Sequence, residues 1–318
     1  MVKKSTKKFW RYYRQWIDLN KVGEIRAVTL DKYYTLARWL EKNEPDIVLG
    51  DMTRSDLQKI VNDYGQTHQK VTTMDMLNHL KASIRDAVYD GYLKKDPIHK
   101  IRITSQVEHK ERLHYLEAEE VRKLVGYFNE HEDDSIAVFC HIVLDTGMRY
   151  AEALAITGED IDKENQLLSV NKTYDYKGTT DNRFMPTKNP SSVRQIKISY
   201  KTLRLLELLK NRYELNDKEP IGYYATAVKE TGRVYNSTCN MRLEKYCKEV
   251  GIRRITVHGL RHTYASLLIS HGVSIQSVAN LLGHSDTITT QKTYIHLLKE
   301  LQQKDNNRVM DILNSLEG

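Results

Sequence analysis

The sequence is poor in cysteine, proline and glycine, and these shortages limit the kind of protein it encodes. Its 318 residues include three cysteines, five prolines and 15 glycines. Cys140, Cys239 and Cys247 are odd in number and irregularly spaced, so they fit neither a disulfide framework nor a CxxC metal site. We expect three reduced thiols in a globular protein.

Long apolar runs are also missing. The mean hydropathy is −0.59, and no uninterrupted apolar stretch is long enough to span a bilayer, which excludes a membrane protein. The first residues, MVKKSTKKFWRYYRQW, run from lysines into aromatics and further charges, where a signal peptide would need an apolar stretch and a cleavage site. These features predict a cytoplasmic protein.

The excess of positive charge lies in the first third of the chain. Residues 1–110 hold 21 Lys and Arg against 14 Asp and Glu, whereas residues 111–318 hold 28 of each. A basic segment joined to a neutral one fits a surface for a polyanion. It fits a well-solvated surface equally well, so charge alone leaves both interpretations open.

Helical periodicity fills the first hundred residues. Thr53 and Asp56 form a predicted capping box for a helix that ends at Gly65, and Thr72 or Thr73 is expected to cap the next helix. Two earlier segments, around 6–18 and 28–43, complete a four-helix unit that holds all three tryptophans. The polar stretch that follows Pro97 lacks helical periodicity and predicts a linker.

The rest of the chain predicts helices interrupted by short strands. Residues 167–198 alternate apolar and polar side chains around a middle rich in Gly, Thr, Asp, Asn and Pro, which is typical of antiparallel strands. Helical patterns cover the remaining segments: 116–130, 134–145, 201–213, 236–249, 259–271 and 274–282.

Polar residues interrupt three of these apolar helical segments. In DTGMRYAEALAI, Arg149 needs either a buried carboxylate partner, for which Glu152 is suitably placed, or an anionic ligand. In VHGLRHTYAS, His258 and Arg261 are three residues apart and share a helix face, where they fit an anion site or simply face solvent.

The third segment, LLGHSDTITTQKTYIH, places His284 after the helix-ending Gly283 and Tyr294 ten residues later. A tyrosine in a sequence with 20 of them is more often a packing residue than a nucleophile. Each segment taken alone therefore allows a structural interpretation.

Taken together and in this order, the segments TGMRYAE, PTKNPSSVRQIKI, HGLRHTYAS, LLGHSD and TY resemble the tyrosine recombinase (phage integrase) family. The resemblance covers about residues 113–298 by motif. It implies a mainly α fold with a small antiparallel β-sheet or hairpin (α+β), in which a helical DNA-binding domain precedes the catalytic domain.

The resemblance also implies roles for individual residues. The family's motif places Arg149, Lys188, His258, Arg261 and His284 around the scissile phosphate, with Tyr294 as the nucleophile and Glu152 as a supporting carboxylate. Lys177 and Lys197 are alternatives to Lys188, which is preferred because TK…S.R.I matches the family's hairpin.

This chemistry needs neither a metal nor another cofactor. Two arginines can neutralise the charge that builds on the phosphate oxygens, and neutral His258 is expected to act as general base for Tyr294. Lys188 is the expected proton donor to the leaving 5′ oxygen. The resulting 3′-phosphotyrosine keeps the bond energy, so a second 5′-hydroxyl can reverse the step without ATP.

The predicted domains are 1–103 for helical DNA binding, 104–113 for the linker, 114–298 for catalysis and 299–318 for a tail helix. This helix could pack on its own domain, but the resemblance implies docking on a neighbouring protomer. The predicted partner is double-stranded DNA with attachment-type core sites, bound by a homotetramer that passes through a Holliday junction in a bacterial cytoplasm. Accessory DNA-bending or excision factors are also expected, whereas the further small N-terminal domain of many phage integrases is expected to be absent.

The function predicted from sequence is therefore site-specific recombination by the integrase of a mobile element. Two enzymes of the same chemistry, a chromosome-dimer resolvase and a type IB topoisomerase, remain alternatives. A non-enzymatic DNA-binding module is the alternative from another class.

Overall fold

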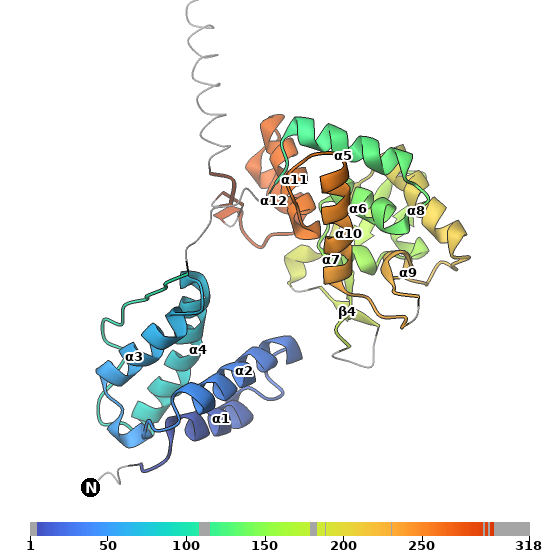
Figure 1. The fold of residues 1–318 in the computed structure, drawn as a ribbon. Helices are drawn as coiled ribbons and strands as arrows, with labels where there is room; N and C mark the ends of the chain where they lie inside the picture. The colour runs from blue at the N-terminus through green and yellow to red at the C-terminus, as the bar shows by residue number, and fades with distance from the viewer. Residues whose placement is uncertain are drawn as a thin grey trace, which may run out of the picture. The chain divides into compact units, whose positions relative to one another are not determined.

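The computed structural model describes residues 5–107, 115–178, 183–187, 189–229, 231–288, 290–291 and 293–295. The chain divides into two compact units, Met1–Arg112 and Leu113–Gly318. The described residues are mainly helical, with short antiparallel strands confined to the second unit (Figure 1). This confirms the predicted fold class.

Four helices and one short 3₁₀ turn form the first unit. The elements are α1 (Phe9–Asn20), α2 (Ala27–Asn43), η1 (Leu49–Asp51), α3 (Arg54–Gly65) and α4 (Lys70–Tyr89). Their apolar faces enclose a core that includes Tyr13, Ile17, Leu40 and Ile84, each fully or almost fully buried. Trp16 is buried in the same core. Because apolar residues recur at helical spacing, each helix turns one apolar face toward this core.

The capping box predicted for α3 is present, but the predicted start of α4 is wrong. Thr53 and Asp56 exchange side-chain and backbone hydrogen bonds at the start of α3. Helix α4 begins at Lys70, before the predicted caps, and the Thr73 hydroxyl instead donates back to the Gln69 carbonyl at 3.2 Å. A threonine inside a helix can satisfy its hydroxyl in this way, so its presence does not mark a helix start.

The chain that follows α4 packs on α3 as far as residue 106. Gln58 bonds both the backbone N–H and the carbonyl of Arg102, and the Gln106 N–H donates to the Gly65 carbonyl at 2.9 Å. Residues 104–106 of the predicted linker are therefore held by hydrogen bonds to the first unit. Residues 108–113 lie outside the described part of the chain.

The second unit surrounds one apolar helix, α6 (Ser135–Thr146). Almost every side chain of IAVFCHIVL in this helix is buried, because α6 packs against neighbours on several sides: α5 (Ala118–Glu130), α8 (Tyr200–Arg212), α9 (Ile221–Thr226), α10 (Asn236–Glu249) and α11 (Val257–Ser270). Helix α7 (Tyr150–Leu154) follows α6, and α12 (Ile275–Leu282) packs on α11 (Figure 1). The three cysteines are free and buried.

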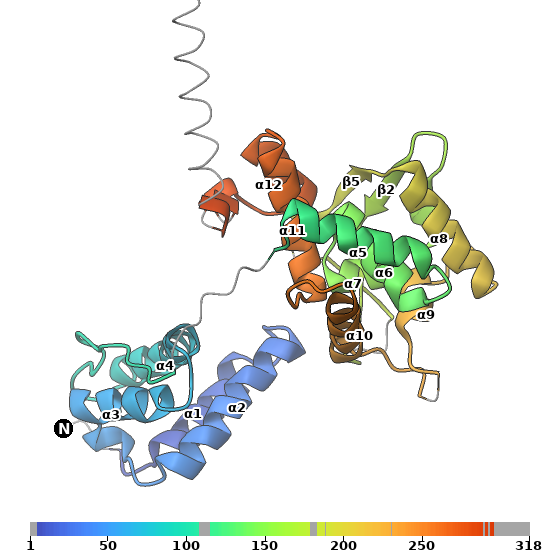
Figure 2. The ribbon, with the colours of Figure 1, turned by 45° about the horizontal axis from the view of Figure 1, so that its top comes forward.

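Two small antiparallel sheets are formed by strands in the predicted segment 167–198 and by one short strand that precedes it and was not predicted. One has the order β1 (Ile161–Asp162), β2 (Leu167–Val170), β5 (Arg194–Lys197), and the other pairs β3 (Lys172–Tyr174) with β4 (Phe184–Pro186). Strands β2 and β5 lie side by side with Leu168 opposite Ile196 (Figure 2). This register places both apolar side chains in the core and fixes which way β5 presents Arg194.

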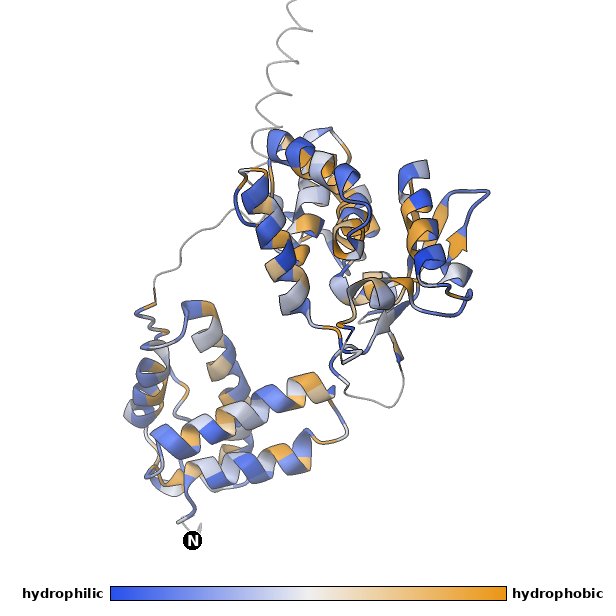
Figure 3. Ribbon diagram, turned by 45° about the vertical axis from the view of Figure 1, so that its right-hand side comes forward, coloured by the Kyte–Doolittle hydropathy of each residue, from blue (hydrophilic) through white to orange (hydrophobic). Residues whose placement is uncertain are grey.

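Figure 3 shows polar and apolar residues mixed along the helices of each unit. Among the described residues, no helix is long and apolar enough to cross a membrane.

Helix α9 approaches α7 so closely that Gly222 is predicted not to tolerate a side chain. A Cβ at Gly222 would collide with the Ala153 carbonyl oxygen and lie 2.8 Å from the Leu154 Cα. Because both are backbone atoms that cannot rotate away, Gly222→Ala is expected to destabilise the second unit by about 1–3 kcal/mol. Urea unfolding followed by circular dichroism measures this change.

Gly126→Ala is the matched control, since nothing lies within 4 Å of its Cβ position in helix α5. It is expected to stabilise the unit by roughly 0.5–1 kcal/mol. Tryptophan fluorescence reports the first unit alone, because all three tryptophans lie there, and it should be unchanged in both variants. Equal stability of the two variants would contradict the prediction.

Candidate active site

A buried carboxylate joins two arginines from different parts of the second unit. Glu152, in the first turn of α7, is 2% exposed. One of its oxygens accepts from Arg149 Nη1 at 2.7 Å, and the other accepts from the Arg149 backbone N–H at 2.9 Å. The second oxygen also accepts from Arg194 Nη2 of β5 at 3.0 Å. Burial raises the pKa of Glu152, but Arg194 and then Arg149 more than offset this effect, so the carboxyl group remains ionised.

Arg194 is a site residue that the sequence analysis did not identify. Besides Glu152, its guanidinium donates to two carbonyls, those of Leu281 at 2.6 Å and Ser192 at 3.0 Å. Its side chain is 6% exposed. The motif PTKNPSSVRQIKI contains this residue, but the spacing of residues in the motif does not indicate that β5 places Arg194 against Glu152 of α7.

Arg149 and Arg261, both predicted from sequence, donate to backbone carbonyls of the other polar motifs. Arg149 Nη2 donates to the Gly283 carbonyl at 3.0 Å. Arg261 donates to the Gly147 carbonyl at 2.7 Å and the Leu282 carbonyl at 2.6 Å. The three polar motifs of the sequence therefore meet in one place.

Gly283 has a conformation that this junction requires. Its φ is +66°, and a Cβ there would lie 3.0 Å from both Arg194 Nη1 and the Ser192 Cα. A residue with a side chain would be strained by the left-handed backbone and would also displace Arg194. The LLG motif thus ends α12 and leaves space for the arginine.

The two arginines differ in their exposure. The side chain of Arg149 is 29% exposed, whereas Arg261 is 2% exposed. Burial, with a smaller contribution from Arg149, lowers the pKa of Arg261 to about 9, so Arg261 is still a cation at neutral pH. Arg149 shares the Glu152 carboxylate with Arg194, so three neighbouring guanidinium groups are balanced by one carboxylate, which favours binding of an anion such as a phosphate.

His284 is a neutral imidazole in this setting. Burial, followed by Arg261 and Arg149, lowers its pKa to about 4. Its Nε2 lies 3.2 Å from Arg261 Nη2, and its Nδ1 lies 2.7 Å from the Thr290 hydroxyl. Because arginine can only donate, Nε2 accepts, and Nδ1 therefore carries the proton that is donated to Thr290.

Tyr294 is buried, and its hydroxyl contacts a histidine that was not predicted. The residue is 1% exposed and belongs to an apolar cluster with Ala265 and Ile269 of α11 and Leu282 of α12. His262 Nδ1 lies 2.7 Å from the hydroxyl oxygen. Burial raises the pKa of Tyr294, and Arg261 partly opposes this effect.

His258, the expected base, is exposed on the same face of α11. Its ring centroid lies 4.7 Å from that of His262 in an edge-to-face arrangement. The imidazole that bonds the Tyr294 hydroxyl is thus one helical turn further along than predicted. The motif VHGLRHT contains two histidines four positions apart, and such positions share a helix face. The sequence could therefore have indicated His262 as a second candidate.

Lys188 lies outside the described residues. Of its two alternatives, Lys197 donates to the Asn165 carbonyl at 2.6 Å, in the turn between β1 and β2. A further lysine of this region, Lys172, forms an ion pair with Asp160 at 2.6 Å. Both ammonium groups are therefore engaged outside the arginine cluster, which we define as Arg149, Arg194 and Arg261.

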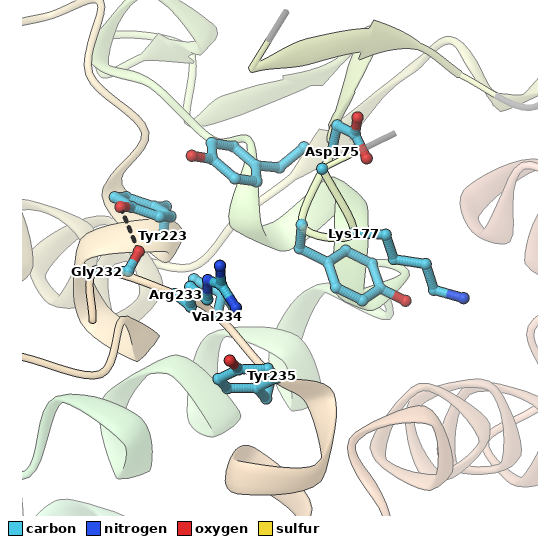
Figure 4. Close-up of a pocket in the computed structure, with 10 residues that line it drawn as sticks. Asp175, Lys177, Tyr223, Gly232, Arg233, Val234 and Tyr235 are labelled. Atoms are coloured by element: carbon cyan, nitrogen blue, oxygen red, sulfur yellow. Dashed lines mark hydrogen bonds between the residues drawn. The ribbon is translucent and has the colours of Figure 1, made fainter. Parts of the chain in front are cut away.

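Lys177, the other alternative, lines a separate pocket of about 760 Å³ between β3 and the segment that joins α9 to α10 (Figure 4). The pocket is aromatic: Tyr174 and Tyr223 stack with ring centroids 4.9 Å apart, and the Tyr223 hydroxyl donates to the Gly232 carbonyl at 2.6 Å. Apart from Lys177, the described residues that line it include none of those predicted for the site. The pocket and the arginine cluster are therefore distinct features of the second unit.

The position of Arg194 predicts a large effect on stability. Arg194→Met leaves the buried Glu152 carboxylate without one of its two cations, and removal of one partner of a buried pair costs about 3–5 kcal/mol. Urea unfolding followed by circular dichroism should show this loss in the second unit. The control is Arg204→Met, which breaks an exposed ion pair with Glu132 and should cost less than about 1 kcal/mol. Equal losses would show that Arg194 does not stabilise the site.

Comparison with known proteins agrees with this geometry. Residues 114–300 match the phage integrase family, which confirms the resemblance inferred from the motifs. The chain is 24% identical to the integrase of Staphylococcus phage L54a over 327 residues, an alignment that covers 91% of this chain and 90% of that integrase.

Two solved structures share the fold. The Tn1549 transposon integrase in complex with transposon right end DNA aligns with a TM-score of 0.73 and 18% identity, covering 94% of this chain and 99% of that chain. A lambda integrase tetramer bound to a Holliday junction aligns with a TM-score of 0.67 and 19% identity, covering 90% of this chain and 77% of that chain. The motifs, the fold and the family match agree: the chain belongs to the phage integrase family and is a tyrosine site-specific recombinase.

Proposed function

We propose that this recombinase cuts and rejoins double-stranded DNA at attachment-type core sites through Tyr294. Two observations carry the proposal. Arg149, Arg261 and His284 lie together where the start of α11 meets the end of α12, and Tyr294 packs against the same two helices. Tyr294 lies close enough to Arg261 for this cation to oppose the rise of the Tyr294 pKa, and a tyrosine near paired arginines is suited to attack on a phosphodiester.

Each group has a distinct task in this proposal. Arg149 and Arg261 bind the nonbridging oxygens of the scissile phosphate, where negative charge grows during attack. His284 holds Arg261 beside the same phosphate through its Nε2, and His258, at the exposed start of α11, contacts the phosphate. Glu152 keeps Arg149 in place, and Lys188 protonates the leaving 5′ oxygen.

The cut is reversible because the phosphotyrosine conserves the phosphodiester bond. A 5′-hydroxyl from a second DNA strand attacks the 3′-phosphotyrosine, releases Tyr294 and joins the strands. Two rounds of exchange pass through a Holliday junction. The lambda integrase tetramer on such a junction, which shares the fold, supports a homotetramer as the active assembly.

The basic first unit supplies affinity for DNA in this proposal. Its excess of Lys and Arg over Asp and Glu fits contacts with the phosphate backbone, and affinity should therefore fall steeply as salt rises. The tail 299–318 lies outside the described residues, and its docking on a neighbouring protomer is part of the same proposal. So are action in the cytoplasm of a bacterial host and the use of accessory DNA-bending factors.

Tyr294→Phe is predicted to abolish covalent attachment to DNA. The junctions that the protein makes in a bacterial cell identify the core site, and a duplex of that site, nicked next to the cleavage position, traps the intermediate. The wild-type chain should form an adduct stable to denaturing electrophoresis, and Tyr294→Phe should form none. The control Tyr200→Phe, an exposed tyrosine of α8, should react as wild type. An adduct in Tyr294→Phe would refute this assignment.

Lys188 is predicted to be the general acid. A bridging 5′-phosphorothiolate leaves without a proton, so this substrate should restore cleavage to Lys188→Ala while the ordinary substrate does not. Lys197→Ala is the matched control and should cleave both substrates at the wild-type rate. Rescue of Lys177→Ala or Lys197→Ala, with none for Lys188→Ala, would move the role to that lysine.

A further inference from the structure

The hydroxyl of Tyr294 is held by one specific nitrogen atom. His262 Nδ1 lies 2.7 Å from the phenol oxygen, which is a short distance for a hydrogen bond between neutral groups. The two ring centroids are 5.9 Å apart and their planes are inclined by 59°. The imidazole thus meets the hydroxyl with its nitrogen rather than by ring stacking.

The surroundings fix both partners of this bond. His262, Ala265 and Ile269 follow one face of α11, and the last two form an apolar cluster with the tyrosine. Val278 and Leu282 of α12 complete the cluster. Because the tyrosine is 1% exposed, bulk water has little access to its hydroxyl, and the proton needs an acceptor within the protein.

The other histidines of the site are differently engaged. Both nitrogens of His284 face other groups, Arg261 and Thr290. His258 is exposed at the N-terminal end of α11, where it suits a contact with the DNA phosphate. His262 is therefore the histidine within proton-transfer distance of the nucleophile.

We infer that His262 is a catalytic residue of this recombinase, the general base that takes the proton of Tyr294 through Nδ1 during strand cleavage. The inference rests on the proposed role of Tyr294 as nucleophile. It replaces His258 as the expected base and leaves His258 a role at the phosphate.

Strand cleavage exchanges one bond at phosphorus for another and moves two protons. The Tyr294 oxygen forms a bond to phosphorus while its proton moves to His262 Nδ1, and the bond from phosphorus to the 5′ oxygen breaks. The leaving oxygen takes a proton from the general acid, expected to be Lys188. During ligation the 5′ oxygen forms a bond to phosphorus and its proton returns to the general acid, expected to be Lys188, while the bond from phosphorus to the Tyr294 oxygen breaks and His262 returns the other proton to that oxygen.

Two substitutions separate proton transfer from positioning. His262→Asn keeps an acceptor close to the position of Nδ1 but cannot take a proton, whereas His262→Leu loses both properties. In single-turnover cleavage of the nicked duplex by the full chain, both variants should form the adduct about 10²–10⁴-fold more slowly than wild type. A wild-type rate in His262→Asn would overturn the proposal, because a hydrogen bond alone would then suffice.

Fluorinated tyrosine at position 294 supplies a readout that a structural role would not move. Fluorination lowers the pKa of a phenol, so the nucleophile depends less on a base. It should restore most of the rate lost in His262→Asn and little of the rate lost in His258→Asn. Rescue of His258→Asn alone would assign the base to His258 and overturn the proposal.

Matched controls keep the result interpretable. His271→Asn changes an exposed histidine at the C-terminal end of the same helix and should leave the cleavage rate unchanged. DNA binding by gel shift should be equal in the wild type and in the His262 and His271 variants. Faster cleavage in His262→Asn or His262→Leu would mean that the bond restrains the tyrosine, which also overturns the inference. Failure of the proposed function is a separate outcome, namely no adduct with the wild-type chain or an adduct in Tyr294→Phe.

Discussion

The buried carboxylate of Glu152, bonded to Arg149 and Arg194, is the interaction on which the rest of the site depends. A carboxylate at 2% exposure is tolerable only where cations and N–H groups replace its lost hydration. Glu152 obtains them from its own helix start and from β5. Glu152, Arg149 and Arg194 therefore connect β5 to the short helix α7. Arg194 also connects both elements to α12, because it donates to the Leu281 carbonyl near the end of that helix.

Hydrogen bonds to the backbone offset the repulsion among the cations of this site. Burial, and after it repulsion by Arg149, lowers the pKa of Arg261. Backbone carbonyls of the glycine turns offset this repulsion by accepting hydrogen bonds from both guanidinium groups. A phosphate would supply the missing negative charge, so DNA binding and stabilisation of the site are expected to be coupled.

The residues of the tyrosine segment belong to a different environment from the arginines. Tyr294 lies in an apolar cluster between α11 and α12, and its polar contact is the imidazole of His262. Charge stabilisation and proton removal are thus assigned to two adjacent residues of α11, Arg261 and His262, whose side chains point in different directions. Two successive residues on a helix point about 100° apart, so α11 can serve the phosphate with one side chain and the nucleophile with the next.

The sequence by itself determined the helices, the strand region and the motif residues Arg149, Glu152, His258, Arg261, His284 and Tyr294, because periodicity and motif order are local properties of a chain. It did not reveal Arg194 or His262. Arg194 reaches Glu152 across 42 positions, and the β2–β5 register that aims it is a tertiary contact. His262 stands out only when Tyr294, 32 positions away, folds onto α11. The start of α4 was misplaced for a similar reason, since the role of a threonine hydroxyl depends on which backbone group it meets.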